Sequence, residues 1–375
     1  MRVLHLSGGN MFGGVETFLV TLSRNASAAP EMEQHFGFCF EGRASGELRA
    51  NRAPVHLLGA VRLRDPLSIR RARRVLRELL RQRAFDLAVC HGVWPLLVFG
   101  PAVRAAGLPL VFWVHDTVDG RHWLQRLARW TVPDLAVCNS RYTASLLPGL
   151  FPRVRREVVY YPVEPSGTLP TEGDRAAIRA ELGTPGDAVV IAQVSRMEAW
   201  KGHTLHLRAL ALLRDVPGWV CWQVGGAQRP SEVAYRTGLE RLAGELGIAD
   251  RVRFLGQRSD VPQILGAADI HCQPNTGPEP FGIAFVEALY AGLPSVTTAM
   301  GGAQEIIDES CGVLVPPDDA QALGDVLRSL AESRDCRRRL GSAGPARAGA
   351  LCAPERQVGR ISALFSTLVR REAAG

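Results

Sequence analysis

Residues 270–298 read IHCQPNTGPEPFGIAFVEALYAGLPSVTT, and this stretch decides the fold class. The pattern predicts a buried strand over Ile270–Gln273, a helix over Ile283–Ala291 and a second buried strand over Ser295–Thr298. The Gly-Leu-Pro turn that begins at Gly292 ends the helix. A strand, a helix and a further strand in this order are typical of a parallel sheet, whose neighbouring strands need a crossover connection.

The same alternation of short apolar runs and longer amphipathic stretches fills the chain, which favours an α/β fold. In the first half we expect strands over Arg2–Ser7, Gln34–Phe40, Pro54–Leu58, Leu87–Cys90, Leu110–His115, Leu135–Cys138 and Glu157–Tyr160. The second series is Ala188–Val194, Trp219–Val224, Val252–Leu255, Ile270–Gln273, Ser295–Thr298 and Gly312–Val315. The clearest helices are Val15–Ser27, Ser68–Arg83, Arg141–Leu147 and residues 355–371.

The pattern breaks at Tyr161–Pro170, where three prolines in ten residues indicate an extended connector. We therefore predict two Rossmann-like, doubly wound domains that face each other across a cleft, over residues 1–165 and 166–354. Residues 355–375 form a last helix that packs back toward the first domain. In such sheets ligands bind beyond the carboxyl ends of the strands, so functional motifs should follow strands.

Composition excludes several classes of protein. The 375 residues are 46% hydrophobic and 22% charged, as in ordinary globular proteins. No run of about 18 apolar residues predicts a membrane span, and no signal peptide is recognisable. The eight cysteines are scattered without a Cys-x-x-Cys pair, which favours free thiols in a reducing cytosol. The sequence also lacks a P-loop, a Gly-x-Gly-x-x-Gly fingerprint, a His-Glu-x-x-His pair and an Asp-x-Asp.

Two carboxylates frame the predicted helix in the opening stretch. Glu279 lies in the loop before the helix and Glu287 lies within it, eight residues further on. Between them, the amides of Gly282, Ile283 and Ala284 lack helical partners, and together with the helix dipole they suit a diphosphate. The two acids would then hold hydroxyls on either side of the diphosphate. The alternative is that they are ordinary acids near a helix terminus.

A pair of cations follows the first strand of the second series. Arg196 and Lys201 lie within Ser195–Gly202, and Lys201 is the only lysine of the chain. Arginine offers phosphate oxygens a fork of donors and lysine a compact charge. Two solvated surface cations are the alternative. If the phosphate interpretation holds, Lys201 and Glu279 must lie close enough to touch one small molecule.

Two weaker motifs follow strands of the first half. The glycine-rich turn at 8–16 lets the backbone approach an anion, or is merely a tight turn. His115 ends an apolar strand and is followed by Asp116. A histidine there could donate to a substrate hydroxyl, or it could be a histidine satisfied within the core.

Arginines crowd one segment of the first half. Only Asp65 and Glu78 balance the cluster, whose members are Arg62, Arg64, Arg70, Arg71, Arg73, Arg74, Arg77, Arg81 and Arg83. Apolar residues at helical spacing predict that this helix docks on its domain. Its cationic side is either a solvated face or a contact for an anionic membrane or an acidic acceptor. We expect no nucleic acid as a partner, because no aromatic residues are interleaved with the charge.

Taken together, the motifs resemble the retaining glycosyltransferases of family 4, which have the GT-B fold, and the resemblance covers nearly the whole chain. The residues that carry it are Gly13-Gly14-Val15-Glu16, His115-Asp116, Asn139-Ser140, Arg196 with Lys201-Gly202, Glu279-Pro280-Phe281-Gly282 with Glu287, Ala291-Gly292-Leu293-Pro294, and residues 301–307 with 312–316. Ser195 departs from the pattern, since the family usually has glycine before the phosphate-binding arginine.

The resemblance implies that the second domain binds a nucleotide sugar and the first an acceptor. Arg196 and Lys201 would neutralise the diphosphate, so that no metal or other cofactor is expected, and Gly14 would assist. Glu287 would hold the ribose, and Glu279 and His115 the sugar that reacts. Gly256, Arg258 and Phe281 would contribute to the donor site. Gly13, Glu16 and Asn139 would contact the acceptor.

The function implied is metal-independent, retaining transfer of a sugar from a nucleotide sugar to a glycan, a lipid-linked or a small-molecule acceptor. The setting would be the biosynthesis of cell-envelope polysaccharide, glycolipid or glycoside, in the cytoplasm or at the inner face of the membrane. Three alternatives remain open: a nucleotide-sugar epimerase, a disaccharide phosphorylase, and a non-catalytic protein that binds nucleotide sugars.

Overall fold

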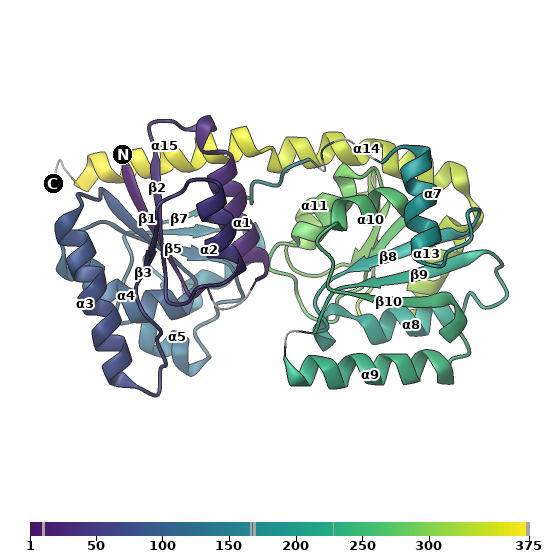
Figure 1. Cartoon of the computed structure of the whole chain (residues 1–375). Helices are drawn as coiled ribbons and strands as arrows, with labels where there is room; N and C mark the ends of the chain where they lie inside the picture. Colours follow the sequence, from purple (N-terminus) through teal and green to yellow (C-terminus); the bar gives the residue numbers. More distant parts are fainter. Residues whose placement is uncertain (10–11, 166, 168–169, 228, 373–375) are drawn as a thin grey trace. The chain divides into compact units, whose positions relative to one another are not determined.

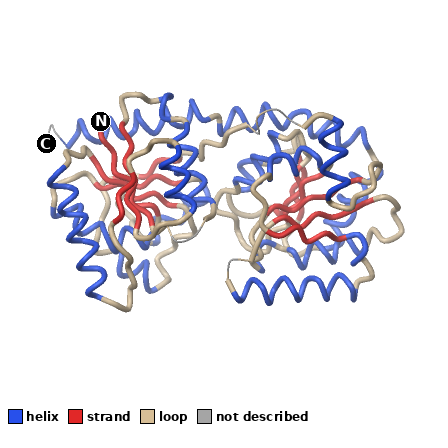
Figure 2. Tube along the Cα trace, viewed as in Figure 1, coloured by secondary structure: helices blue, strands red, loops and turns tan. Residues whose placement is uncertain are grey.

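A computed structural model describes residues 1–9, 12–165, 167, 170–227 and 229–372 (Figure 1). The chain divides into two compact units, each with its own sheet (Figure 2). Unit 1 comprises Met1–Val163 and Cys352–Gly375, and unit 2 comprises Glu164–Leu351. The expected last helix is therefore a part of unit 1. None of the described helices is both long enough and apolar enough to cross a bilayer.

Unit 1 contains a seven-stranded parallel sheet in the order β3-β2-β1-β4-β5-β6-β7. Its strands are β1 (Arg2–Ser7), β2 (Glu33–Phe38), β3 (Val55–Leu57), β4 (Leu87–His91), β5 (Leu110–Val114), β6 (Leu135–Cys138) and β7 (Arg156–Val158). The central strands β4 and β5 are buried along their whole length. Helices cover both faces of a parallel sheet, which explains why these strands are continuous apolar runs in the sequence.

The helices of unit 1 are α1 (Gly14–Arg24), η1 (Ala26–Ala28), α2 (Arg43–Ala50), α3 (Pro66–Gln82), α4 (Val93–Ala105), α5 (Trp123–Ala128), α6 (Arg141–Leu146), η2 (Leu147–Gly149) and α15 (Pro354–Glu372). The helix expected over Val15–Ser27 is interrupted, because Asn25 leaves the helical conformation and its side chain donates to the carbonyl of Thr21. The last helix, α15, packs on α1 and η1, with Phe365 fully buried (Figure 1).

Unit 2 contains a six-stranded parallel sheet in the order β10-β9-β8-β11-β12-β13. Its strands are β8 (Val189–Val194), β9 (Trp219–Val224), β10 (Val252–Gly256), β11 (Ile270–Gln273), β12 (Ser295–Thr298) and β13 (Gly312–Val315). The two sheets confirm the predicted α/β class with two doubly wound domains. Each of the thirteen expected strands is present among the described residues, with ends that differ by at most two positions.

The helices of unit 2 are α7 (Glu172–Glu181), η3 (Ala199–Lys201), α8 (His203–Ala211), α9 (Pro230–Glu245), η4 (Ala249–Arg251), α10 (Val261–Ala267), α11 (Ile283–Tyr290), α12 (Ala303–Ile306), α13 (Ala320–Glu332) and α14 (Arg334–Cys352). The helix predicted over Ile283–Ala291 is α11, which ends one residue earlier because Ala291 is its C-cap.

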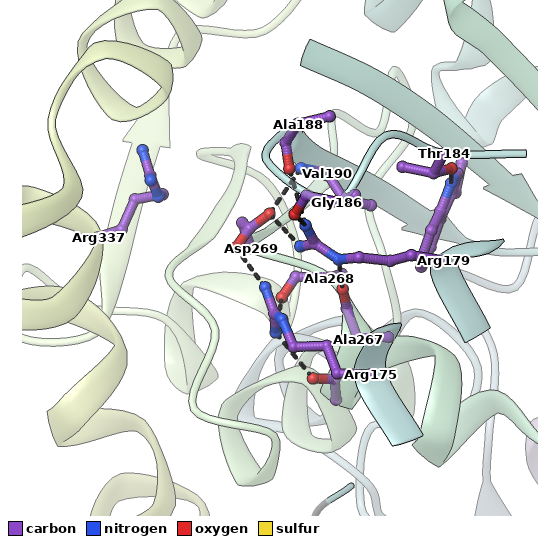
Figure 3. Close-up of polar contacts among 12 residues, drawn as sticks. Arg175, Arg179, Thr184, Gly186, Ala188, Val190, Ala267, Ala268, Asp269 and Arg337 are labelled. Atoms are coloured by element: carbon purple, nitrogen blue, oxygen red, sulfur yellow. Dashed lines mark hydrogen bonds and ion pairs between the residues drawn. The ribbon is translucent and has the colours of Figure 1, made fainter. Parts of the chain in front are cut away.

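A buried cluster of arginines fastens α7 to the sheet of unit 2 (Figure 3). The guanidinium groups of Arg175 and Arg179 converge on the carboxylate of Asp269, which precedes β11. Asp269 also accepts a hydrogen bond from the amide of Val190 in β8, at 2.7 Å. Arg179 is only 5% exposed, and it donates to three backbone carbonyls as well. Charged groups this deeply buried are stable only when such partners satisfy them.

Strand order reverses between β1 and β4 in unit 1 and between β8 and β11 in unit 2. At such a switch point, the loops that leave the carboxyl ends of the two central strands diverge and open a crevice. In unit 2 these loops carry Lys201, which follows β8, and Glu279, which follows β11. In unit 1 they are the glycine-rich turn after β1 and the start of α4 after β4. The fold thus positions the glycine-rich turn, Lys201 and Glu279 at the two switch points, whereas His115 follows β5.

Candidate functional site

An ion pair lies at the switch point of unit 2. Lys201 Nζ is 2.6 Å from Glu279 Oε2, with side chains that are 14% and 9% exposed. The ammonium group of Lys201 also lies 3.9 Å from the centre of the Trp200 ring. An ammonium group has three N–H donors, so the bond to Glu279 leaves two for other oxygens. The structure thus brings together the two residues that had to be neighbours under the diphosphate interpretation.

Neighbouring amides fix the orientation of the Glu279 carboxylate. Gln273 Nε2 and Asn275 Nδ2 donate to Oε2 at 3.3 and 3.2 Å, so that atom accepts three hydrogen bonds. Gln273 Nε2 also donates to Asn275 Oδ1 at 3.1 Å. Among the described residues, none donates to Glu279 Oε1. One oxygen is therefore held by the protein and the other is available to a ligand.

Close backbone contacts hold three loops around this carboxylate. Gly202 has a φ of +76°, and a Cβ there would lie 1.7 Å from the carbonyl oxygen of Pro274. The amide of Thr276 donates to the carbonyl of Trp200 at 2.8 Å, which ties the loop after β11 to η3. From the loop after β12, Gly302 donates to the carbonyl of Glu279 at 2.7 Å. The site is therefore rigid, and Gly202 is required for the close approach.

The start of α11 faces the same part of unit 2 with open amides. Its N-cap, Gly282, has a φ of +102° and no side-chain cap. As in any helix, the first amides, here those of Ile283 and Ala284, have no partner within the helix. These residues are only partly buried, so their N–H groups can bind an anion. The combination of a cation with unfilled helix amides suits a phosphate group.

Glu287, one turn into α11, differs from Glu279. Its side chain makes no ion pair or hydrogen bond with another described residue, and burial raises the pKa of its carboxyl group to about 7. A carboxyl group that lacks donors in an apolar setting gains most from a ligand hydroxyl. This fits the ribose-binding role implied by the resemblance.

Arg196 lies, like Lys201, in the loop that follows β8, and its guanidinium group is paired with two carboxylates. Its Nη2 is 2.6 Å from Glu232 in α9 and 3.2 Å from Glu198. Its Nε atom is buried without a hydrogen-bond partner in the part of the chain described. The structure shows no contact between Arg196 and Lys201, so the expected convergence of the two cations on one phosphate stays a prediction.

The other residues predicted for the donor site lie at or beyond the ends of β10 and β11 of the same sheet. Gly256 ends β10, and its carbonyl accepts from the amide of Gly225 at 2.8 Å. The guanidinium group of Arg258 is engaged by Asp260 and Glu181, at 2.7 and 2.9 Å. Phe281 is buried at the N-terminal end of α11.

In unit 1 the glycine-rich turn closes on itself. The amide of Gly13 donates to Glu16 Oε2 at 3.1 Å, and α1 begins at Gly14. The two preceding positions, 10 and 11, lie outside the described residues. Glu16 therefore serves the start of the helix, and its contact with an acceptor stays a prediction.

A row of hydrogen-bonded histidines crosses the sheet of unit 1. His5 Nδ1 is 2.9 Å from His91 Nε2, and His91 Nδ1 is 2.8 Å from His115 Nε2. His115 Nδ1 bonds to the hydroxyl of Tyr161. Burial lowers the pKa of His5 and His115 to about 3 and that of His91 well below its usual value, so all three rings are neutral at physiological pH.

Both ring nitrogens of His115 thus have partners within unit 1. The row resembles the satisfied histidine that was the alternative at this position, although His115 keeps some exposure to solvent. Asn139 belongs to the same network: its Nδ2 donates to the carbonyl of His115 and to Tyr161, and its Oδ1 accepts from Thr143. Asn139 is 1% exposed and supports this network, and its contact with an acceptor stays a prediction.

Sequence reasoning missed several residues of these networks. Gln273 and Asn275 follow β11 within the stretch that was singled out, and their nearness to Glu279 in sequence was a usable signal. His91 ends β4 beside the switch point, so strand register could have indicated its bond to His115. Glu232 lies 36 residues from Arg196 in the sequence, and no local pattern predicts the ion pair between them. Among the described residues, no group of three or more His, Cys, Asp or Glu side chains is arranged to hold a metal ion.

Two doubly wound units, one with a cation and open helix amides at its switch point, define the class of nucleotide-binding α/β proteins with two Rossmann-like domains. The family model described as Glycosyl transferases group 1 matches residues 174–347, and the one described as Glycosyltransferase Family 4 matches residues 12–166. Because the two models together match most of the chain, the chain belongs, within that class, to the glycosyltransferases with the GT-B fold that resemble family 4.

Several known proteins are similar to this chain. The D-inositol 3-phosphate glycosyltransferase of Mycobacteroides abscessus is 40% identical over 164 residues, which are 42% of this chain and 36% of the relative. That of Streptomyces coelicolor is 36% identical over 191 residues, or 48% of this chain and 41% of the relative. The chain thus matches well under half the length of these two relatives. Among solved structures, Anabaena HepE in complex with UDP-glucose has a TM-score of 0.86 at 25% identity, covering 98% of this chain and 99% of that chain.

Proposed function

We propose that the protein is a retaining glycosyltransferase that takes a sugar from a nucleotide-sugar donor bound at the switch point of unit 2. The observation that carries the proposal is the Lys201–Glu279 pair beside the open amides of α11. UDP-glucose is the first donor to test, because HepE was crystallised with it. The relatives named for D-inositol 3-phosphate favour a small phosphorylated acceptor over a polymer.

The chemistry follows from where charge develops. When a nucleoside diphosphate departs, negative charge grows on its phosphate oxygens and the sugar becomes oxocarbenium-like. Lys201 has two N–H donors left for those oxygens, and the amides of Ile283 and Ala284 supply more. Such preorganised donors act where charge appears in the transition state, so the proposal needs no metal ion. Departure and attack on the same face of the sugar would retain the anomeric configuration.

Glu279 and Glu287 would bind the hydroxyl groups of the donor. Glu279 Oε1 would accept a hydrogen bond from a hydroxyl of the donor sugar, while Oε2 stays bound to Lys201. Glu287 would accept from the ribose. His115 would reach the sugar only by sharing or exchanging one of its present partners, His91 or Tyr161. The eight cysteines are free thiols, seven of them buried, which supports a reducing cytoplasm as the place of action.

The decisive experiment combines binding with turnover. The melting temperature of unit 2 is followed with UDP, UDP-glucose and GDP-mannose, since a ligand that binds only the folded state raises the midpoint. Release of UDP from UDP-glucose is then measured with inositol 3-phosphate, glucose 6-phosphate or no acceptor. Acceptor-dependent release with an α-linked product supports the proposal. Conversion of the donor without an acceptor indicates an epimerase, phosphate-dependent turnover a phosphorylase, and binding without any turnover a non-catalytic protein.

The acceptor could instead be lipid-linked, which requires that the chain reach a membrane surface. The arginine-rich segment 62–83 contains α3, where Ala72 and Leu76 are buried. Most of its arginines are exposed, whereas Arg73 donates to the carbonyls of Leu97 and Val98 in α4. We include an anionic bilayer among the proposed partners on this ground. Transfer to a water-soluble acceptor and no binding to anionic vesicles would remove the bilayer from the proposal.

A further inference from the structure

Unit 1 exposes large apolar side chains on one side of α5 and of the turn that follows it. Trp123, Leu127 and Trp130 are 56%, 47% and 89% exposed. Positions separated by four and then three residues share one face of a helix. Val132, just beyond, is 51% exposed. We call residues 121–132 the tryptophan segment.

The opposite side of the tryptophan segment is small or polar and faces the protein. Gln125, Ala128 and Thr131 are 9%, 0% and 6% exposed. Gln125 accepts from the amide of Gly120 at 2.6 Å and donates to the carbonyl of Thr117 at 3.2 Å. A surface helix normally buries its apolar stripe and exposes its polar side. Here the arrangement is inverted, and hydrogen bonds of a buried glutamine hold it in place.

Positive charge surrounds the exposed stripe. The tryptophan segment contains Arg121, Arg126 and Arg129, all exposed, and no acidic residue. Helix α4 packs against both α5 and α3, so the arginine-rich helix belongs to the same layer of unit 1 (Figure 1). The exposed arginines of α3 are Arg70, Arg71, Arg74, Arg77 and Arg81. The apolar stripe of α5 and the cationic side of α3 thus belong to two helices that both pack on α4.

We propose that the tryptophan segment docks unit 1 on an anionic lipid bilayer, with Trp123, Leu127 and Trp130 inserted among the headgroups. Tryptophan rings favour the membrane interface, and arginines beside them bind lipid phosphates. An apolar stripe or a group of arginines alone binds a bilayer weakly, whereas the two together give stable binding. The proposal concerns binding and does not depend on which sugar is transferred.

Charge and side-chain type favour lipid over the other possible occupants. A symmetric pair of copies would place the arginines of one stripe against those of the other, at a cost in repulsion. Single-stranded nucleic acid stacks its bases on aromatic rings along a basic groove. Leu127 and Val132 are aliphatic, and the stripe lies on a convex helix, so they contribute nothing to stacking. Lipid satisfies both the aliphatic and the cationic residues.

The test is co-sedimentation of the full chain with vesicles of phosphatidylcholine alone or with phosphatidylglycerol added. We expect binding only to the anionic vesicles, together with a blue shift of tryptophan fluorescence. Trp123→Ala/Trp130→Ala should lower the affinity by about tenfold or more, because two interfacial rings are lost. Arg126→Gln should weaken binding at low salt and have less effect at high salt.

Control variants come from exposed positions of unit 2. Val233→Ala removes an apolar side chain that is 53% exposed on α9, and Arg241→Gln removes an exposed arginine of the same helix. Both should bind vesicles as the wild type does, and all variants should keep the wild-type melting temperature. Equal binding by the tryptophan variant and the wild type overturns the proposal. So does absence of binding to anionic vesicles, a dimer that this variant dissociates, or preferential binding of single-stranded RNA.

Discussion

A double-mutant cycle on Lys201 and Glu279 separates the structural role of the ion pair from its role in transfer. The two groups are 2.6 Å apart and mostly buried. Removing one partner of a buried pair costs about 3–5 kcal/mol, because the other charge is left without compensation. Lys201→Met leaves Glu279 with the amides of Gln273 and Asn275, so we expect a smaller loss than this range, about 2–3 kcal/mol.

The second single variant and the double variant complete the cycle. Glu279→Gln leaves the Lys201 ammonium on the Trp200 ring and partly solvated, so we expect a loss of about 2 kcal/mol in the free energy of unfolding. Lys201→Met/Glu279→Gln replaces the pair by neutral groups of similar size. It should cost about 1–2 kcal/mol in total, so that the coupling energy is about 3 kcal/mol.

Urea unfolding followed by the fluorescence of the buried Trp219 and Trp222 measures these changes in unit 2. The matched control is the pair Arg241–Glu245, 3.3 Å apart with side chains 79% and 59% exposed, whose coupling should not exceed about 0.5 kcal/mol. Transfer from UDP-glucose should fall by at least about a hundredfold in both single variants and stay low in the double variant. Single-variant costs that add to within about 0.5 kcal/mol, or a double variant with restored turnover, would refute this reasoning.

Three further predictions address neighbouring features. If Glu287 binds the ribose as a carboxylate, its pKa of about 7 predicts that affinity for UDP rises about tenfold between pH 6 and 8 in calorimetric titrations. Glu287→Gln should show only the titration of UDP itself. Gly202→Ala should destabilise unit 2 by at least about 3 kcal/mol and abolish UDP binding, because its Cβ would collide with the Pro274 carbonyl. The control Gly238→Ala in α9 should be neutral or stabilising by up to about 1 kcal/mol. Equal urea midpoints for the two variants would contradict this prediction. Burial lowers the pKa of His115 to about 3, so between pH 3 and 6.5 the unfolded state binds more protons than the folded state. The urea midpoint of unit 1 should therefore fall as the pH falls through this window. His115→Gln should make the midpoint depend less steeply on pH, and the same dependence in the variant and the wild type would show that His115 does not contribute.

The strands could be predicted because a parallel sheet covered on both faces requires runs of apolar residues. The Leu135–Cys138 strand is one example, since all four residues are buried. Helix α11 could be predicted as well, because the glycines at both ends are visible in the sequence. The meeting of Lys201 with Glu279 followed from a general rule, that the loops after the two central strands line one crevice at a switch point.

The rest depends on contacts that sequence distance conceals. The convergence of Arg175 and Arg179 on Asp269 joins residues about ninety positions apart, and no periodicity announces it. The direction of the Trp130 ring was equally hidden, because an amphipathic pattern is normally interpreted with its apolar side inward. Only the burial of Gln125, on the inner side of α5, shows that the segment is inverted.

The charged groups of the proposed donor site are paired with one another in the structure. Lys201 and Arg196 contact three carboxylates, those of Glu279, Glu198 and Glu232. The groups joined by these contacts therefore carry one more negative than positive charge, and a long-range field from them would not attract a diphosphate. Affinity for a donor must then come from short-range hydrogen bonds, those of the Lys201 ammonium and of the α11 amides. Because such bonds are screened far less by salt than the attraction between distant charges, the site selects a ligand by geometry more than by charge.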